Sequence, residues 1–137
     1  MTHKPGPAAL LREDHDALEQ LAMKIIESVE EGDREDVSNA VTAMEASILT
    51  HLEGEERELI PRYARENPVE AASILGEHAT IRKNLTELDV ATDLHLLRAT
   101  ALRALLESLR THAKRENAGM YRWAEATAES ATAESNL

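Results

Sequence analysis

The chain contains two His-x-x-x-Glu pairs, His51 with Glu55 and His112 with Glu116. Residues four apart lie on one face of an α-helix, so each imidazole and its carboxylate would point in the same direction. Each pair continues an apolar stripe of helical period, formed by Val37, Val41, Met44 and Ile48 before the first and by Leu102, Leu105 and Leu109 before the second. Burying these polar groups in a core is costly unless they are paired or bind a metal ion, so the pattern predicts a metal site.

Two further histidines, His15 and His78, also interrupt apolar stripes. The stripes are Leu11, His15, Leu18, Ala22, Ile25, Val29 and Ala71, Ile74, His78, Ile81, Leu85, Leu88. A single histidine in such a stripe is more often a hydrogen-bonded core residue than a metal ligand. Four inward histidines together with two carboxylates favour the metal site over that alternative. His3, near the N-terminus, and His95, near a turn, are out of register with the others and are expected to be surface residues.

Four helices are predicted to position these side chains. Alanine, leucine, glutamate and arginine are abundant and aromatic residues are scarce, which favours helices over strands. Proline is tolerated in the first turn of a helix, aspartate is a common N-cap and glycine commonly ends a helix. The predicted boundaries are a first helix from Pro7 to about Glu31 ending at Gly32, a second from Asp33 towards Pro61, a third opening at Asn67-Pro68 and a fourth after Thr92-Asp93.

The predicted turns also place the four stripe histidines at one level. In an antiparallel bundle, two residues at the same height are equidistant along the chain from the turn that joins their helices. The midpoints between positions 15, 51, 78 and 112 fall at or within a few residues of the three predicted turns. We therefore predict an all-α, up-down-up-down antiparallel four-helix bundle with a short C-terminal helical extension.

A single domain is expected over residues 1–137, because a chain of 137 residues builds one hydrophobic core. The bundle is expected to cover about residues 8–124. Met120 to Trp123 should continue the helix after Gly119. The rest, residues 125–137, is a low-complexity tail in which Ala-Thr-Ala-Glu-Ser occurs twice, and it is expected to fray because it has little to bury.

The composition narrows the classes of partner. The formal net charge of −11 disfavours nucleic acid and anionic lipid and favours cation capture. The absence of cysteine argues against disulfides, and no apolar run is long enough for a membrane span. With no recognisable secretory signal, a cytoplasmic protein is expected, as a monomer or weak homodimer that binds a small diatomic or peroxide ligand.

Four imidazoles and two carboxylates at one level would hold two borderline metal ions. Structural zinc sites usually close with four ligands, and magnesium or calcium prefers oxygen ligands, so iron is the first choice, with manganese or zinc as substitutes. Glu58 is expected to be solvated, and so is Glu56 unless it contacts the site as an outer partner. No catalytic residue is assigned beyond the metal site. The predicted metal ligands are His15, His51, Glu55, His78, His112 and Glu116.

These segments resemble the motifs of hemerythrin-like HHE cation-binding domains, and the resemblance extends from about Leu10 to Trp123. The motifs are Leu-Arg-Glu-Asp-His15, His51-Leu-Glu-Gly-Glu-Glu-Arg-Glu-Leu-Ile-Pro61, Gly-Glu-His78 and His112-Ala-Lys-Arg-Glu116-Asn. The resemblance implies an up-down four-helix bundle that holds a non-haem di-iron centre. It also implies that Glu55 and Glu116 bridge the two irons, together with an oxo or hydroxo group.

The pattern differs from that of oxygen-carrying hemerythrins, which have a fifth histidine on the third helix. The positions four residues either side of His78 are Ile74 and Arg82. The pattern H, H-x-x-x-E, H, H-x-x-x-E is similar to that of iron-centre-repair di-iron proteins and of the hemerythrin-like iron-sensing domain of an F-box protein. Two histidines and shared bridges would leave an open position on each iron, which suits reaction with dioxygen, peroxide or nitric oxide in oxidative or nitrosative stress defence. The alternative is a non-enzymatic iron or oxygen sensor, a store or a reversible oxygen-binding protein, so whether the chain is an enzyme stays open.

Overall fold

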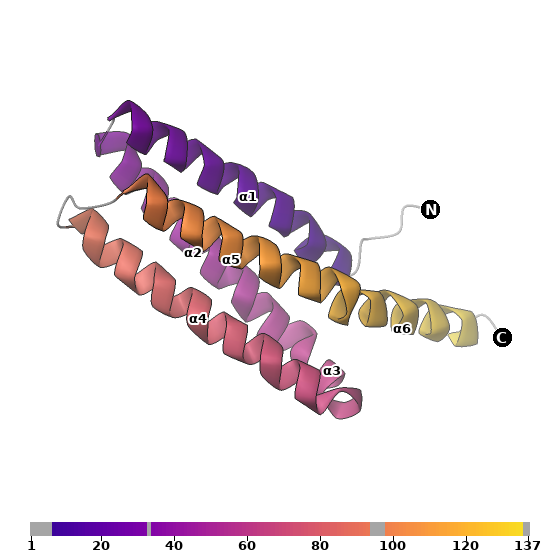
Figure 1. The fold of residues 1–137 in the computed structure, drawn as a ribbon. Coiled ribbons are helices and arrows are strands. Elements are labelled where there is room, and N and C mark those ends of the chain that lie inside the picture. Colours follow the sequence, from indigo (N-terminus) through magenta and orange to yellow (C-terminus); the bar gives the residue numbers. More distant parts are fainter. Residues whose placement is uncertain (1–6, 33, 94–97, 136–137) are drawn as a thin grey trace, which may run out of the picture.

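The computed structural model describes residues 7–32, 34–93 and 98–135 (Figure 1). Over these residues the chain is helical, without a strand, as the sequence predicts. His3, His95 and the expected N-cap Asp33 lie outside the described residues. The helices are α1 (Pro7–Glu31), α2 (Arg34–Glu58), α3 (Ile60–Glu66), α4 (Pro68–Asp93), α5 (Ala99–Ala118) and α6 (Met120–Ser135).

Four long helices, α1, α2, α4 and α5, form a helical bundle (Figure 1). Helix α1 packs against α2 and α5, and α4 packs against the same two helices. Each long helix therefore has two long neighbours and turns one face towards a common interior. The short helix α3 connects α2 to α4 at one end of the bundle, and α6 extends from α5 beyond it.

The apolar stripes fill two clusters of buried side chains. The larger cluster contains residues of α1, α2, α4 and α5, among them Ile25, Met44, Ile81 and Leu102. The smaller one contains Leu11, Leu59, Ile60, Tyr63, Ala71, Ile74, Met120 and Tyr121. On α1 and α4 the predicted ligands lie between residues of the two clusters, and on α2 and α5 they lie near the helix end, with residues of the smaller cluster following at Leu59 and Met120. The two apolar layers therefore cover the polar level from both ends and keep water from reaching it along the bundle axis.

Local sequence and packing together explain where the helices end. Gly32 follows α1 with φ of 82°, a left-handed conformation that glycine adopts without steric cost. Helix α2 was predicted to run towards Pro61 but ends at Glu58, and Pro61 lies in the first turn of α3. A proline there lacks only a donor that a first helical turn leaves free in any case. Buried Leu59 and Ile60 hold this junction against the smaller cluster.

The C-terminal helical extension is longer than predicted. Helix α6 continues to Ser135 instead of ending near Trp123. The repeated Ala-Thr-Ala-Glu-Ser segment consists largely of alanine and glutamate, whose high intrinsic helix propensity extends the helix even where few apolar side chains are available. Gly119 separates α5 from α6, and its N–H donates to the carbonyl of Arg115 at 3.0 Å. No helix in the described ranges is long and apolar enough to cross a membrane.

Candidate metal centre

All six predicted ligands meet in the interior of the bundle. The side chains that could hold a metal form two overlapping groups, one of His15, His51, Glu55 and Glu116 and one of Glu55, His78, His112 and Glu116. Within each group the candidate ligand atoms lie within 4.8 Å of one another. Five of the six residues are buried, and His15 keeps a small exposed fraction of its side chain, 11%. Both groups share Glu55 and Glu116, as two adjacent ion sites with common bridging carboxylates would require.

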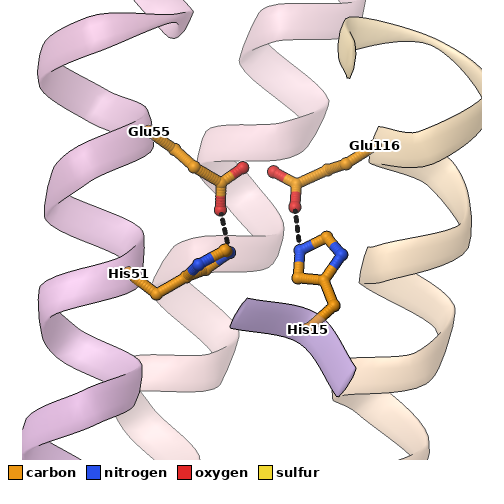
Figure 2. Close-up of side chains that lie close together, drawn as sticks. All are labelled: His15, His51, Glu55 and Glu116. Carbon is orange, nitrogen blue, oxygen red and sulfur yellow. Dashed lines mark ion pairs between the residues drawn. The ribbon is translucent and has the colours of Figure 1, made fainter. Parts of the chain in front are cut away.

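The first group lies between α1, α2 and α5 (Figure 2). His51 Nε2 is 2.9 Å from Glu55 Oε1, one helical turn further along α2. His15 Nε2 is 3.2 Å from Glu116 Oε1 on α5. Figure 2 shows the two carboxylates facing each other, each with one imidazole beside it. The His15 and His51 ring centroids are 4.8 Å apart, so these two rings form one pair.

The second group brings the other two histidines to the same two carboxylates. His112 Nε2 is 3.0 Å from Glu116 Oε1 within α5. His78 Nε2, from α4, lies 3.7 Å from Glu55 Oε1 and 3.6 Å from Glu116 Oε2. The His78 and His112 ring centroids are also 4.8 Å apart. The four histidines therefore divide into two pairs around two shared glutamates.

The buried ligand atoms lack ordinary hydrogen-bond partners. Unpartnered buried atoms among the described residues include Nε2 of His51, His78 and His112 and both carboxylate oxygens of Glu55 and Glu116. The short contacts among them are close in distance but do not have hydrogen-bond geometry. Leaving so many polar atoms unsatisfied in one place is costly, and native interiors rarely do so. Imidazole nitrogens and carboxylate oxygens aimed at a common space fit a pair of metal ions.

Three of the four histidines are oriented by an outer carboxylate. His51 Nδ1 lies 3.2 Å from Asp14, His78 Nδ1 lies 2.7 Å from Glu56 and His112 Nδ1 lies 2.8 Å from Glu77. An Nδ1–H that donates to a carboxylate leaves the Nε2 lone pair facing the interior, where a metal would bind. From the sequence, only Glu56 was considered for this role. Asp14 and Glu77 were missed, although each directly precedes a predicted ligand and so lies on the adjoining helix face.

Two arginines hold two of these outer carboxylates. Arg82 donates to both oxygens of Glu56, at 2.6 and 2.8 Å. This contact lowers the pKa of Glu56 despite the partial burial of its carboxylate. Arg115 lies 3.3 Å from Glu77. Glu58, in contrast, is exposed beside Arg57, as expected for a solvated residue.

The crowded carboxylates change the protonation of the metal-free centre. Burial lowers the pKa of His112, but contacts with Glu116, Glu55 and Glu77 outweigh burial and raise the pKa to about 10. The pKa of His51 is raised by the same balance, with Glu55 and Asp14 outweighing burial. Burial raises the pKa of Glu116, but its neighbours, first Glu55 and then three imidazoles, lower that pKa well below its ordinary value. The metal-free centre therefore holds protons that a metal ion would have to displace.

Tyr121 is a further residue at the centre that the sequence analysis did not identify. It is fully buried in α6, and its hydroxyl lies 3.3 Å from His15 Nε2. Burial and the nearby carboxylates of Glu116 and Glu55 raise the pKa of Tyr121, so the phenol is neutral. Its position shortly after Gly119 was the available signal, because a residue five positions beyond Glu116 lies within about two helical turns of the ligand level.

A cavity of about 390 Å³ borders the centre between α1, α2 and α5. Its lining includes His15, His51, His112 and Asn117, together with apolar residues such as Leu18 and Leu106. The volume exceeds that of a diatomic molecule or peroxide. A small ligand could therefore approach the histidines along this side of the bundle.

Comparison with known families agrees with this geometry. The model of the hemerythrin HHE cation binding domain family matches residues 6–124, which is most of the chain. The chain therefore belongs to this family, and the resemblance seen in its motifs is confirmed. No curated protein and no solved structure gives a significant match. At the level of class, this is a hemerythrin-like cation-binding domain with a His/Glu group that could hold a metal.

Proposed function

We propose that the protein binds two metal ions, which we take to be iron, through His15, His51, Glu55, His78, His112 and Glu116. This proposal rests on one observation. Imidazole nitrogens and carboxylate oxygens lie buried and without hydrogen-bond partners at one level of the bundle. Two histidines would bind each ion, and the two glutamates would be shared. The accompanying topology is an up-down-up-down four-helix bundle within a single domain.

Iron is favoured by the mixture of nitrogen and oxygen donors. Two imidazoles and shared carboxylates suit borderline divalent ions better than magnesium or calcium, which favour oxygen alone. Manganese or zinc could occupy the same ligands. Only iron or manganese would add redox chemistry, because zinc has none.

The proposed activity is reaction with dioxygen, peroxide or nitric oxide in defence against oxidative or nitrosative stress. When bound, the metal pair would supply exchangeable coordination positions and electrons. The protein supplies the histidine orientation through Asp14, Glu56 and Glu77, the apolar layers that exclude water and the cavity that admits a small ligand. Such a cavity is of more use to a reacting centre than to a purely structural one.

A non-enzymatic sensor or store of iron or oxygen is the second candidate. The burial of Glu55 and Glu116 without hydrogen-bond partners favours it, because a centre that is unfavourable without metal makes the stability of the fold depend on metal. A sensor could use that dependence directly.

Two measurements test the proposal. Metal analysis of protein from iron-supplemented cells should give two ions per chain, and one ion or fewer after full reloading would reject the two-ion centre. The iron-loaded protein should then consume added hydrogen peroxide or nitric oxide faster than the zinc-loaded protein. Equal rates for the two forms would leave the sensor or store as the function and reject the enzymatic one.

A further inference from the structure

The metal centre is built from two similar halves. The half on α1 and α2 contains Asp14, His15, His51, Glu55 and Glu56, and the half on α4 and α5 contains Glu77, His78, His112, Glu116 and Asn117. Each half has an acid directly before its first histidine and a His-x-x-x-Glu pair on its second helix. The two halves can therefore be compared position by position, and a difference between them is a difference between the two ion sites.

The acid before each first histidine plays the same part in both halves. Asp14 lies 3.2 Å from His51 Nδ1, and Glu77 lies 2.8 Å from His112 Nδ1. Each acid thus orients the histidine of the second helix in its own half. At this position the halves differ mainly in exposure, because the side chain of Asp14 is 51% exposed whereas that of Glu77 is 28% exposed and lies beside Arg115.

The residue after each shared glutamate breaks the repeat. Glu56, which follows Glu55, lies 2.7 Å from Nδ1 of His78 in the other half. Its counterpart is Asn117, which follows Glu116 and would correspondingly serve His15. His15 Nδ1 and Asn117 Oδ1 are instead both buried and without a hydrogen-bond partner. His15 is therefore the one histidine of the four whose Nδ1 has no carboxylate among the described residues.

The histidines of the two ion sites therefore differ in the outer carboxylates that orient them. Both His78 and His112 are held by outer carboxylates, and both of those carboxylates contact an arginine. In the other pair, Nδ1 of His51 contacts only a half-exposed aspartate, and Nδ1 of His15 has no carboxylate partner among the described residues. An outer carboxylate fixes the imidazole ring and raises its basicity, and removing such a partner typically weakens metal binding about 10- to 100-fold.

We infer that the ion bound by His78 and His112 binds first and tightly, whereas the ion bound by His15 and His51 is the weaker, exchangeable one. This inference rests on the two-ion centre proposed above. The cavity between α1, α2 and α5 is lined by both histidines of the weaker pair and Asn117, and also by His112 of the tighter pair. Glu56 acts as the positioning residue for His78, and the corresponding Asn117 provides no carboxylate for His15.

Anaerobic titration of the metal-free protein with Co²⁺, against a chromophoric chelator, measures the two dissociation constants. The wild-type protein should bind two ions with constants that differ at least tenfold. His15→Ala should keep one ion at the wild-type tight affinity, whereas His78→Ala should bind its remaining ion at least tenfold more weakly than that. Two equal constants, or equal remaining affinities in the two variants, would overturn the inference but leave the two-ion centre in place. Binding of fewer than two ions by the wild type would instead overturn the proposed centre.

Exchanging the outer residues tests the cause of the difference. Asn117→Glu supplies the missing carboxylate. It should lower the dissociation constant of the weaker ion at least tenfold without changing that of the tighter ion. Asn117→Asp provides the same charge with almost no change in size, should the longer side chain not fit. Glu56→Gln should weaken the tighter ion selectively. A matched control is Asn39→Glu, which makes the same charge change at an exposed position of α2.

The selectivity of these effects separates positioning from general stability or charge. Asn39→Glu should leave both constants within about twofold of the wild type. If Asn117→Glu and Asn39→Glu change both dissociation constants by the same factor, the effect is one of general charge, and this result would overturn the role of Asn117. The role of Asn117 would also be overturned if neither Asn117→Glu nor Asn117→Asp changes the dissociation constant of the weaker ion, provided that both metal-free variants melt at the wild-type temperature.

Discussion

Glu56 links His78 to Arg82 across the interface between α2 and α4. His78 Nδ1 lies 2.7 Å from one carboxylate oxygen, and Arg82 donates to both oxygens at 2.6 and 2.8 Å. The arginine therefore fixes the carboxylate that in turn fixes the histidine. Glu56 reaches this position because it follows Glu55 on the helix and so faces the neighbouring helix when Glu55 faces the interior.

Replacing Arg82 should weaken metal binding without a large loss of fold stability. In Arg82→Ala the Glu56 carboxylate loses both charge-assisted hydrogen bonds, so it orients His78 less well. We expect metal affinity to fall about tenfold, measured by competition with a chelator. The matched control is Arg57→Ala, which removes an equal charge from an exposed residue that contacts Glu58. If both variants bind metal equally, the link through Glu56 does not support the centre.

The sequence was enough to predict the six interior residues because helical period and residue type together are strong signals. His15, His51, His78 and His112 replace apolar residues in otherwise regular stripes, and the structure places all four beside Glu55 and Glu116. What helical period could not supply is the identity of contacts between helices. Asp14 and Glu77 lie on helix flanks where charged residues are usually solvated, and only the packing of neighbouring helices brings them to an imidazole.

The ends of the helices were less predictable for the same reason. The stop at Gly32 follows from local backbone chemistry, and the structure agrees. The junction at Leu59 depends on how Leu59 and Ile60 pack into the smaller cluster, which no local pattern determines. Tyr121 was missed because its contact with His15 requires α6 to continue α5 across Gly119. Tertiary packing, and not propensity, decided these positions.

Removing a single ligand should impair metal loading and lower the melting temperature of the loaded protein. His51→Ala or Glu55→Ala leaves the remaining ligands buried without their partner, and the protein loses the stabilisation that bound metal gives to the native state. We expect less than two ions per chain by metal analysis and a lower melting temperature. His3→Ala and His95→Ala serve as histidine controls and should change neither quantity. Full loading of His51→Ala would reject His51 as a ligand.

Two substitutions of Tyr121 should separate its packing from its hydroxyl. Tyr121→Ala leaves a cavity in the smaller cluster and should lower the free energy of unfolding of the metal-free protein by about 3–5 kcal/mol. Tyr121→Phe keeps the ring and removes only the hydroxyl contact with His15, so it should cost about 1 kcal/mol. Urea denaturation measures both values. Equal losses in the two variants would mean that the hydroxyl, and not the ring, provides the stabilisation.

The stability of the metal-free protein should fall as pH rises from about 6.5 towards about 10. The pKa of His112 is raised from 6.5 to about 10 in the folded chain, so protonated His112 favours folding. A raised folded-state pKa gives stability that is fully present below the unfolded value and is lost as pH rises through the folded value. Melting temperatures of chelator-treated protein across this window measure the effect. A melting temperature that rises steadily towards pH 10 would contradict the raised pKa.

The same titration affects metal binding in the opposite direction. A metal ion needs neutral imidazoles, so binding should release protons and become tighter as pH rises through the same window. Proton release can be measured by calorimetry in buffers of different ionisation enthalpy. The metal-loaded protein should therefore lack the alkaline loss of stability seen without metal, and a loaded protein that loses stability in parallel with the metal-free one would contradict this coupling.

The last prediction concerns dioxygen. Each proposed ion has two histidines and shares Glu55 and Glu116, so neither has the third histidine that would saturate it. The bordering cavity admits a small ligand to this pair. Because both ions would then exchange ligands, both could give electrons to dioxygen, and the reduced iron-loaded protein should oxidise quickly and not recover when oxygen is removed.

Stopped-flow absorbance after mixing with oxygenated buffer, followed by deoxygenation, measures this behaviour. Zinc-loaded protein is the control and should show no absorbance change, because zinc has no redox chemistry. An absorbance change that reverses fully on deoxygenation would identify a reversible oxygen-binding protein and refute the reactive centre. Leu106→Ala tests whether apolar side chains hinder the access of dioxygen to the metal pair, since Leu106 lines the cavity. If access limits the reaction, the wider cavity should speed oxidation, whereas an unchanged rate would place the slow step at the metal pair itself.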